Sequence, residues 1–549
     1  MIRYRLLAPI ALLAAGAIAP LAAQQTPAAH TAHAAPAMPA AADSVPIYTD
    51  LGTFSRRVST RSTAAQRYFD QGMRLTYGFG KPEAVRAFRA AIRADSACAM
   101  CWWGLAWALG PYINGPTIDS ATAAQAHEAA QRAVALQGNG TPIERALIDA
   151  MAARFSAAPP RESRKPLDSA YAHAMRDVVR RFPADLDAAA LFGESLMMLR
   201  PRVTGLWTRT GDPAPGTEEL LRTFEGVLKR DPRHPGACHH YIHATEASPQ
   251  PGRAAACADL LGAVIPGASH IPHMPSHTYM RIGRYADAVR ANQQARLADQ
   301  RAAFGGAPGI YVAHNAFMLA SAAAMDGQSA VSILAAADLA RESAGAGYYH
   351  RAMLVRFGRW REVLALAPAS APSFIAGIDA FARGMAHLAL EAPDSARAYQ
   401  ATLDAVLAGT ADSLRFRAHA QKSLLGIARG ILAGEREARA GRHDAAVTAL
   451  RAALALEDSL TYDEPEPWPI PVRHVLGAVL LEAGRGAEAE AVYREDLRVH
   501  PGNGWALAGL EHALRAQNKP TEAVTKEKEK AWERADVVLV GSRFRPGKP

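Results

Sequence analysis

Two pairs of histidines with the same internal spacing recur along the chain, and the interval between them constrains the chain to a repeating helical architecture. The first pair is His239 and His243, and the second is His273 and His277. Residues four positions apart share one face of an α-helix, so each pair predicts two imidazoles on one helix face. The interval matches the period of about 34 residues that is typical of a unit of two helices joined by a turn. Stacked units would bring both pairs to the same side of the array.

The composition also favours helices. The 549 residues are enough for several ordinary domains, but alanine, leucine, arginine and glutamate are abundant and runs of β-branched residues are few. Helical periodicity recurs from about Thr63 to Ala535. The sequence therefore predicts a quasi-one-dimensional helical array rather than several independent globules.

Small and aromatic residues recur at the positions where the two helices of a repeat unit meet. They are Tyr68, Gly72, Ala84, Phe88 and Ala91 in the first unit, and Leu476, Gly477, Ala489, Tyr493 and Pro501 near the end. Pro232 and Pro266 are separated by the same interval as the histidine pairs and end successive units, because proline cannot continue a helix. The pattern resembles the tetratricopeptide repeat superfamily over most of the chain. The resemblance implies an all-α fold, a right-handed α-solenoid of stacked helix–turn–helix repeats.

Three segments are also similar to a family of exported bacterial tetratricopeptide proteins. They are HPGACHHYIHATEAS, HIPHMPSHTYMRIGRYADA and YDEPEPWPIPVRHVLGAVLLEAGR. This second resemblance implies an α-solenoid in an exported protein, and it does not imply a reaction.

The tetratricopeptide resemblance implies that positions 2, 5, 9 and 12 of the first helix in each unit face the concave groove. The residues at these positions are His239, His243 and Glu246 in one unit, His270, His273 and His277 in the next, His314 in the following unit, and Glu194 in an earlier one. The imidazoles would then line the groove rather than the apolar interface between helices.

Two prolines interrupt this pattern. Pro272 and Pro275 each lack an N–H group, and each disfavours a helical conformation in the residue before it. We therefore expect residues 270–274 to form a loop that runs into a helix beginning near Pro275. His277 would lie on that helix, whereas His270 and His273 would come from the loop.

The concentration of imidazoles indicates a metal site. Neutral imidazole binds Zn, Cu, Ni or Fe, and three histidines with a carboxylate suffice for a zinc site with an open position. The preferred ligands are His239, His243 and His277, followed by His273, His314 and His270. The expected cofactor is a divalent transition metal, with Zn favoured and Cu or Fe as alternatives. Glu246 or Glu194 would be a ligand, a partner that orients a ligand, or the base for a metal-bound water.

Other interpretations of the same residues stay open. The sulfur atoms of Met197, Met198, Met274 and Met280 would suit copper, although methionine at helical spacing more commonly fills a core. Alternatively, the histidines hydrogen-bond one another and nearby hydroxyls in a polar seam without metal. Candidate ligand-binding residues beside the histidines are Tyr241, Ser276, Tyr279, Arg281 and Asn315.

The N-terminal residues predict export. Residues 1–23 combine Arg3 and Arg5 with an apolar run and small residues, which is typical of a cleaved signal peptide. Residues 24–46 predict a flexible tether rich in Ala, Pro and His. We expect an N-terminal repeat superhelix with the His-rich groove over 47–345, and C-terminal repeats with a tail over 346–549. The protein would be periplasmic or secreted, with no transmembrane segment.

The charge distribution indicates which class of partner to expect. Without Arg3 and Arg5, 59 basic residues face 52 acidic ones, which gives a net charge of about +7. The positive charges are dispersed along helices and form no basic stripe with interleaved aromatic residues, so a nucleic-acid partner is not expected. The expected partner is a peptide or protein in the concave groove, or a small molecule. The oligomeric state is left open.

Four cysteines are too few for a disulfide scaffold in a chain of this length. Cys98 and Cys101 predict a small disulfide or two metal-binding thiolates, and the absence of a following histidine excludes c-type haem attachment. Cys238 and Cys257 are a second candidate pair. A structural role is favoured for all four.

A proline-rich segment, residues 462–471, interrupts the last repeats. Its four prolines make it stiff and extended, and it is interpreted as a plain connector. In the alternative interpretation it folds over the groove and presents Trp468 and Glu464 to a ligand.

Three classes of function fit these features. The first is a binding or scaffold protein whose groove holds a metal together with a peptide or small ligand. The second is a metal-dependent hydrolase or a related enzyme with Glu246 or Glu194 as the base. The third is periplasmic metal handling, of copper above all. The chain has no HExxH motif, nucleophile elbow or P-loop, so whether it is an enzyme stays open.

Overall fold

The computed structural model describes residues 45–157, 163–201, 203–342, 344–370 and 373–544. The predicted signal peptide and most of the predicted tether lie outside these residues. Within them the chain forms 25 α-helices, five short 3-10 helices and one two-stranded sheet. The prediction of an all-α fold is confirmed.

The helices divide into three groups along the chain. The first group is α1 (Thr63–Tyr77), α2 (Lys81–Ala94), α3 (Ala99–Leu109), α4 (Ser120–Leu136), η1 (Gln137–Asn139), α5 (Pro142–Ala152), α6 (Lys165–Arg181), α7 (Leu186–Met198), η2 (Val203–Gly205) and α8 (Thr217–Arg230). The second is α9 (Pro235–Thr245), η3 (Pro251–Ala254), α10 (Ala255–Leu261), α11 (His270–His273), α12 (Pro275–Arg281), α13 (Tyr285–Arg301), η4 (Ala302–Phe304), α14 (Val312–Met325) and α15 (Ser329–Glu342).

The third group completes the chain and includes the small sheet. It is η5 (Ala344–Ala346), α16 (Gly347–Arg356), α17 (Trp360–Ala365), α18 (Phe374–Ala389), α19 (Pro393–Gly409), β1 (Arg415–Phe416), β2 (His419–Ala420), α20 (Gln421–Arg439), α21 (His443–Asp458), α22 (Val472–Glu482), α23 (Gly486–Val499), α24 (Gly504–Arg515) and α25 (Glu522–Ala531). Strands β1 and β2 form an antiparallel hairpin.

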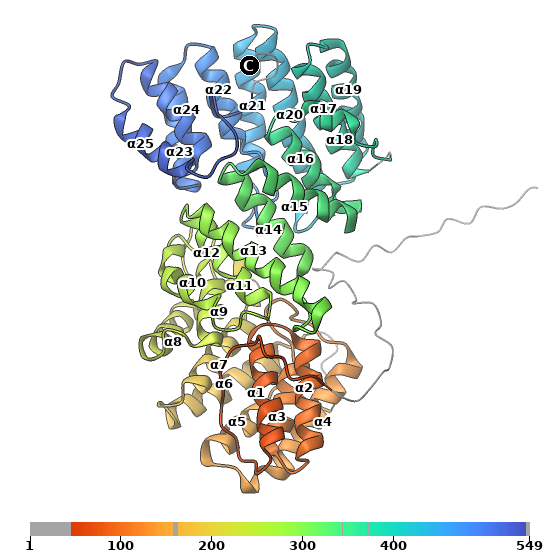
Figure 1. Cartoon of the computed structure of the whole chain (residues 1–549), viewed down its shortest axis with the longest axis vertical. Coiled ribbons are helices and arrows are strands. Elements are labelled where there is room, and N and C mark those ends of the chain that lie inside the picture. The colour runs from red at the N-terminus through yellow and green to blue at the C-terminus, as the bar shows by residue number, and fades with distance from the viewer. Residues whose placement is uncertain (1–44, 158–162, 202, 343, 371–372, 545–549) are drawn as a thin grey trace, which may run out of the picture.

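Consecutive helices pack against each other, and the N-terminal, middle and C-terminal helices follow one another along the long axis of an elongated molecule (Figure 1). Helices α1–α5 lie at one end, α8–α13 in the middle, and α16–α25 at the other end. This arrangement is that of an α-solenoid, in which each unit mainly contacts its neighbours. Among the described residues, no helix is both long enough and apolar enough to cross a bilayer.

Close contacts between glycines and aromatic rings explain the repeat pattern of the sequence. Phe88 of α2 lies between Gly72 of α1 and Gly104 of α3, and a Cβ atom on either glycine would stand 2.6 or 2.2 Å from the Phe88 ring. Tyr493 of α23 is enclosed in the same way by glycines of α22 and α24. In each case the glycine is required because any side chain would separate the helices.

A charged hub joins the first helices to those that carry the histidines. Arg56, in the segment before α1, forms ion pairs of 2.9 Å with Asp185 and Asp187 at the start of α7. The Tyr77 hydroxyl, at the end of α1, donates to Asp187 over 2.7 Å. His234 Nε2, just before α9, lies 3.2 Å from the same carboxylate. Asp187 therefore connects α1, α7 and α9.

The predicted division near residue 345 stays a prediction, and several contacts cross that position. Trp505 Nε1 donates to the carbonyl of Ala324 over 2.9 Å. The Asp536 carboxylate accepts hydrogen bonds from the backbone N–H groups of Ser329 and Ala330. The C-terminal helices are thus tied directly to α14 and α15.

Replacement of Arg56 tests the importance of this hub. We expect Arg56→Met to lower the free energy of unfolding of the N-terminal helices by about 3–5 kcal/mol, because two carboxylates would lose their cation in a largely buried site. Urea denaturation followed by circular dichroism measures the change. The neighbouring, exposed Arg57→Met is the matched control and should change stability by no more than about 0.5 kcal/mol. Equal effects of the two substitutions would contradict the hub.

Candidate metal centre

Six histidines converge in the interior between four helices. They are His239 and His243 on α9, His270 and His273 on α11, His277 on α12, and His314 on α14. The first five are at most 3% exposed, and His314 is partly buried. The structure thus brings together all six predicted metal ligands, in an enclosed space rather than along an exposed groove.

The imidazoles form two adjacent sets of three. In the first set, His239, His243 and His270 have ring nitrogens within 4.8 Å of one another, and the second set consists of His273, His277 and His314. His239 Nε2 lies 3.1 Å from His270 Nε2, and His273 Nε2 lies 2.7 Å from His277 Nε2. The expected first-choice trio of His239, His243 and His277 is therefore divided between the two sets.

Three of the imidazoles are oriented by an acceptor at Nδ1. His239 Nδ1 donates to the carbonyl of Tyr77 over 2.6 Å, and His273 Nδ1 donates to Asn292 Oδ1 over 2.6 Å. His243 Nδ1 donates to Glu246 Oε1 over 2.9 Å. With the proton held on Nδ1, the lone pair of each ring is on Nε2, which is the nitrogen left for other partners.

Two carboxylates border the cluster. Glu246 Oε2 lies 2.6 Å and Glu464 Oε2 lies 2.8 Å from His277 Nδ1. Glu246 is completely buried, and it forms a third possible ligand group with His243 and Glu464. Glu464 belongs to the proline-rich segment, so the interpretation of that segment as a plain connector is wrong. The segment folds over the site because Arg417 holds Asp463 in an ion pair and donates to the Glu464 carbonyl.

Trp468 of the same segment does not reach the histidines. It is 2% exposed and packs against Tyr348 and Phe381 in the C-terminal core. Of the two residues in the alternative interpretation, Glu464 reaches the histidine cluster and Trp468 anchors the segment in the C-terminal core.

Burial keeps most of the imidazoles neutral. Desolvation lowers the pKa of His239, His270 and His273, and neighbouring imidazoles lower it further. Desolvation and the nearby His277 lower the pKa of His243 to about 3. For His277, desolvation is outweighed by the carboxylates of Glu464 and Glu246, which raise its pKa to about 10. Burial and the charge of Glu246 also raise the pKa of Glu464.

Phe79 covers the first set of imidazoles and was not predicted from the sequence. Its ring lies 4.2 Å from His239, 5.3 Å from His270 and 5.9 Å from His243, measured between ring centroids. Its φ angle is +61°, a conformation that costs energy for a bulky residue and is concentrated at functional sites. The sequence signal is the aromatic residue between Gly78 and Gly80 directly after α1.

The expected loop at 270–274 is wrong. Residues His270–His273 form the helical turn α11, and Met274 has helical angles of φ −52° and ψ −37°. Pro272 lies within the first turn of α11, where its missing N–H would have no partner in any case. The expected start of a helix at Pro275 is confirmed.

The other candidate residues lie apart from the imidazoles. The hydroxyls of Tyr241 and Tyr279 donate to Glu225 and Asp259. Glu194 accepts from Trp107 Nε1 over 3.0 Å, in a separate buried cluster with Arg154.

Two more candidates are buried near the site. Asn315 donates to the Asp299 carboxylate and the Ile310 carbonyl, which fixes the start of α14. The Ser276 hydroxyl is buried and makes no hydrogen bond among the described residues. The fifth candidate, Arg281, lines a pocket beside His277 and Glu464.

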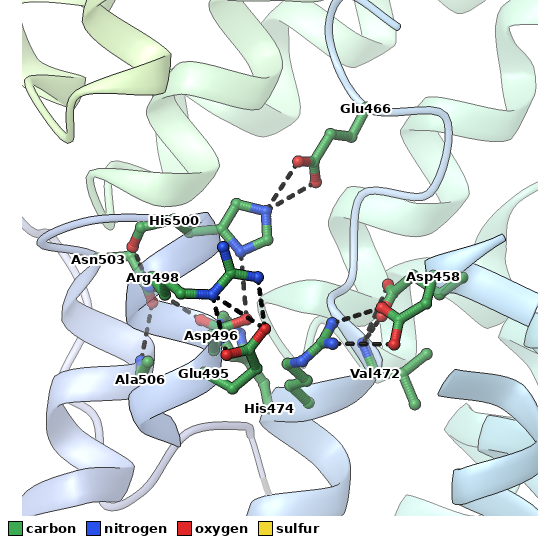
Figure 2. A network of polar contacts seen from close by, with 12 residues as sticks. Asp458, Glu466, Val472, His474, Glu495, Asp496, Arg498, His500, Asn503 and Ala506 are labelled. Carbon is green, nitrogen blue, oxygen red and sulfur yellow. Dashed lines mark hydrogen bonds and ion pairs between the residues drawn. The ribbon is translucent and has the colours of Figure 1, made fainter. Parts of the chain in front are cut away.

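This pocket is lined on α12 by His277 of the histidine cluster and at the end of α23 by Val499, with His500 beside it. The Nε2 atom of His500 lies 2.8 and 2.9 Å from the two carboxylate oxygens of Glu466, which also lines the pocket. Figure 2 shows His500 between Glu466 and Asp496, with His474 on the other side of Asp496. Glu466 comes from the same proline-rich segment as Glu464. That segment therefore lines the pocket both at His277 and at His500.

The cysteines are structural in this arrangement. Cys98 and Cys101 form a disulfide at the start of α3, which confirms one of the two sequence alternatives. Cys238 and Cys257 are buried free thiols, so the second candidate pair is not bonded.

No family model and no curated protein sequence matches the chain. One similar solved structure is the APC/C hetero-tetramer Cut9–Hcn1, at 12% identity and a TM-score of 0.29, covering 87% of this chain and 78% of that one. A human IFIT1 dimer with PPP-AAAA has 10% identity and a TM-score of 0.29, and the match covers 86% of this chain and 90% of that one. The human IFIT1 dimer with m7Gppp-AAAA has 10% identity and a TM-score of 0.29, and the match covers 87% of this chain and 92% of that one. In its motifs and its paired helices, the chain resembles the tetratricopeptide repeat superfamily.

Proposed function

We propose that the histidine cluster binds a divalent transition metal and that the helical array is its scaffold. The observation that carries the proposal is the orientation of His239, His243 and His273, each of which has Nδ1 held by an oxygen and directs Nε2 toward the cluster. His239 and His273 direct Nε2 at the Nε2 atom of another imidazole, and Nε2 of His243 has no hydrogen-bond partner among the described residues. Metal-binding histidines in proteins are oriented in this way by a carbonyl or carboxylate. A seam of mutually bonded histidines does not require it.

The polar atoms in the cluster fit a cation. His243 Nε2 and His270 Nδ1 are buried without a hydrogen-bond partner among the described residues. Each unsatisfied buried polar atom lowers the stability of the fold by about 1–3 kcal/mol. A ligand that satisfied both atoms would remove this cost. A transition-metal ion would satisfy several ring nitrogens together, and neutral imidazole is the form it needs.

Zinc is the ion that the proposal favours, with copper or iron as alternatives. Imidazole and carboxylate donors suit all three. The two adjacent sets of histidines offer places for more than one ion. Sulfur ligands would favour Cu(I). Among the His, Cys, Asp and Glu side chains of the described residues, the groups close enough to share an ion consist of histidine and glutamate.

Export is part of the proposal. It is supported by the Cys98–Cys101 disulfide, because disulfides persist mainly in oxidising compartments. The N-terminal sequence supports it independently. A periplasmic or secreted metal-binding scaffold, holding a peptide or a small ligand beside the ion, is the function that we propose.

A second candidate is a metal-dependent hydrolase. It is favoured by the pocket that reaches His277 and Glu464, since a bound ion there would be accessible to a substrate. Such an ion activates water, and Glu246 or Glu464 would accept the proton. Glu194 is less suited to this role because it bonds Trp107 in another cluster.

Metal content tests the main proposal. Full-length protein purified without chelators or a polyhistidine tag should contain near-stoichiometric metal by elemental analysis. We expect His243→Gln/His277→Gln to lose at least about nine-tenths of it, because one ligand disappears from each set. After removal of the bound metal, added Zn²⁺ at about 100 times its Kd should stabilise the natural chain by about 2.7 kcal/mol, and the double variant should lack this gain.

The control for this experiment is His240→Gln. His240 is a buried histidine on α9 that bonds the Gly236 carbonyl and belongs to neither set. It should keep its metal. A natural chain that is empty and binds no added metal would contradict the proposal, and the polar seam would then be the better interpretation.

The role of Glu464 is tested by comparing two glutamates of the same segment. We expect Glu464→Gln to weaken metal affinity about 10- to 100-fold, because it would remove a ligand or an orienting carboxylate. Glu466→Gln removes the partner of His500 and should leave the affinity nearly unchanged. Competition with a chromogenic chelator measures both. Equal affinities would show that Glu464 only neutralises His277.

The hydrolase candidate requires an open coordination position. Protein loaded with Co²⁺ should change its visible spectrum when azide is added if such a position exists. The His243→Gln/His277→Gln variant should give no such change. A spectrum that is unaffected by azide would indicate a closed site and would favour the scaffold.

A further inference from the structure

In the part of the chain that the structure describes, the pocket beside the cluster contains one cation that forms no ion pair. Arg281, the last residue of α12, donates from Nη2 to the Ser248 carbonyl over a long 3.4 Å and lies above the Tyr462 ring. Its Nε is buried and makes no hydrogen bond, and none of the described residues forms an ion pair with its guanidinium. A partly buried arginine normally has such a partner.

The carboxylates that line the pocket already have cations of their own. Glu464 lies at His277, and Glu466 lies at His500. Asp463 pairs with Arg417 and His419, outside the pocket. Arg281 is near enough to Glu466 to contribute to lowering the pKa of that carboxyl, but it forms an ion pair with none of these carboxylates, so its guanidinium keeps donors for a ligand.

Two further donors in the same pocket also lack partners. The hydroxyls of Tyr285, which is 4% exposed, and of Ser321, which is 8% exposed, make no hydrogen bond among the described residues. Tyr285 begins α13 four residues after Arg281, and Ser321 is on the face of α14 that borders the pocket. Together with Arg281 they offer three donor groups to a ligand with several acceptor oxygens.

The rest of the wall is apolar. Met318 and Met325 lie on the same face of α14 as Ser321, at a spacing of three and four residues, and Met280 of α12 borders the same pocket. Methionine side chains are flexible and adapt to apolar ligands of different shapes. The pocket thus combines a small polar region with an apolar one.

We propose that this pocket binds a small carboxylic acid with an apolar body, with the carboxylate at Arg281 and the apolar part among Met280, Met318 and Met325. A guanidinium matches the two oxygens of a carboxylate in geometry and charge. His277 lies one helical turn before Arg281 on α12 and lines the same pocket, so the ligand would lie beside the histidine cluster. This inference names the ligand class of the proposed metal-binding site, and the contact with Arg281 does not itself need the ion.

Binding of four simple probes to the full-length, metal-free protein tests the proposal. The probes are hexanoate, acetate, 1-hexanol and hexylamine, and saturation-transfer NMR titrations give their Kd values. We expect hexanoate to bind about 100-fold more tightly than acetate, because four additional methylene groups are buried. It should also bind about 10- to 100-fold more tightly than 1-hexanol, which cannot pair with Arg281. Hexylamine should bind most weakly of the six-carbon probes.

Two variants distinguish the contribution of the Arg281 charge from that of the pocket volume. Arg281→Gln should weaken hexanoate binding about 10- to 100-fold and leave 1-hexanol unchanged. Ala324→Leu, which fills the pocket from α14, should weaken both. The matched control is Arg284→Gln, three residues from Arg281, since Arg284 pairs with Asp259 and Asp287 and does not line the pocket. It should bind hexanoate as the natural chain does.

Other outcomes would overturn the ligand class. They are a Kd of the Arg281→Gln variant equal to that of the natural chain, tighter binding of hexylamine than of hexanoate, or hexanoate binding that occurs only after metal is added. The last result would place the carboxylate on the ion rather than on Arg281. These outcomes are measured independently of the metal content of the purified protein. Failure of this inference is therefore distinguishable from failure of the proposed metal site.

Discussion

The carboxylate of Asp187 is the point on which the arrangement of the first helices depends. It faces Arg56 from the N-terminal segment, the Tyr77 hydroxyl and His234, which together draw three separate parts of the chain around one charge. Burial opposes this charge, but His234 and Arg56 outweigh burial and hold the pKa of Asp187 well below its usual range. Tyr77 links this charge to the histidine cluster, because its hydroxyl donates to Asp187 and its carbonyl accepts a hydrogen bond from His239 Nδ1.

A network of this kind makes the position of a cluster histidine depend on charges that are remote from it. His239 is oriented by α1, His273 by Asn292 of α13, and His243 by Glu246 at the end of its own helix. Each histidine has an orienting partner from a different element. The solenoid gives the rough alignment of the helices, and these hydrogen bonds set the direction of each ring.

Local periodicity allowed the sequence to predict the repeats and the six histidines, because residues four apart share a helix face and units of equal length stack in register. The same rule explains why Tyr241 and Tyr279 lie elsewhere. Each is two positions from a cluster histidine, which is about 200° around a helix, so it faces the other side. Asn292 was missed as a site residue, and Glu464 was named only in the less favoured interpretation of its segment, because both come from other elements. No local pattern reveals that Phe79 would adopt a left-handed conformation.

The origin of Glu464 has a consequence for how the protein is assembled. The six imidazoles are in place once α14 has formed, but Glu464 lies much further along the chain, beyond β1, β2 and α20–α21. During synthesis or passage through a translocation channel, the N-terminal helices would emerge first and hold an incomplete cluster. The full set of donors exists only when the last third of the chain has folded back onto them. Acquisition of the ion in its final form would thus be a late event, and the proline-rich segment would signal that folding is complete.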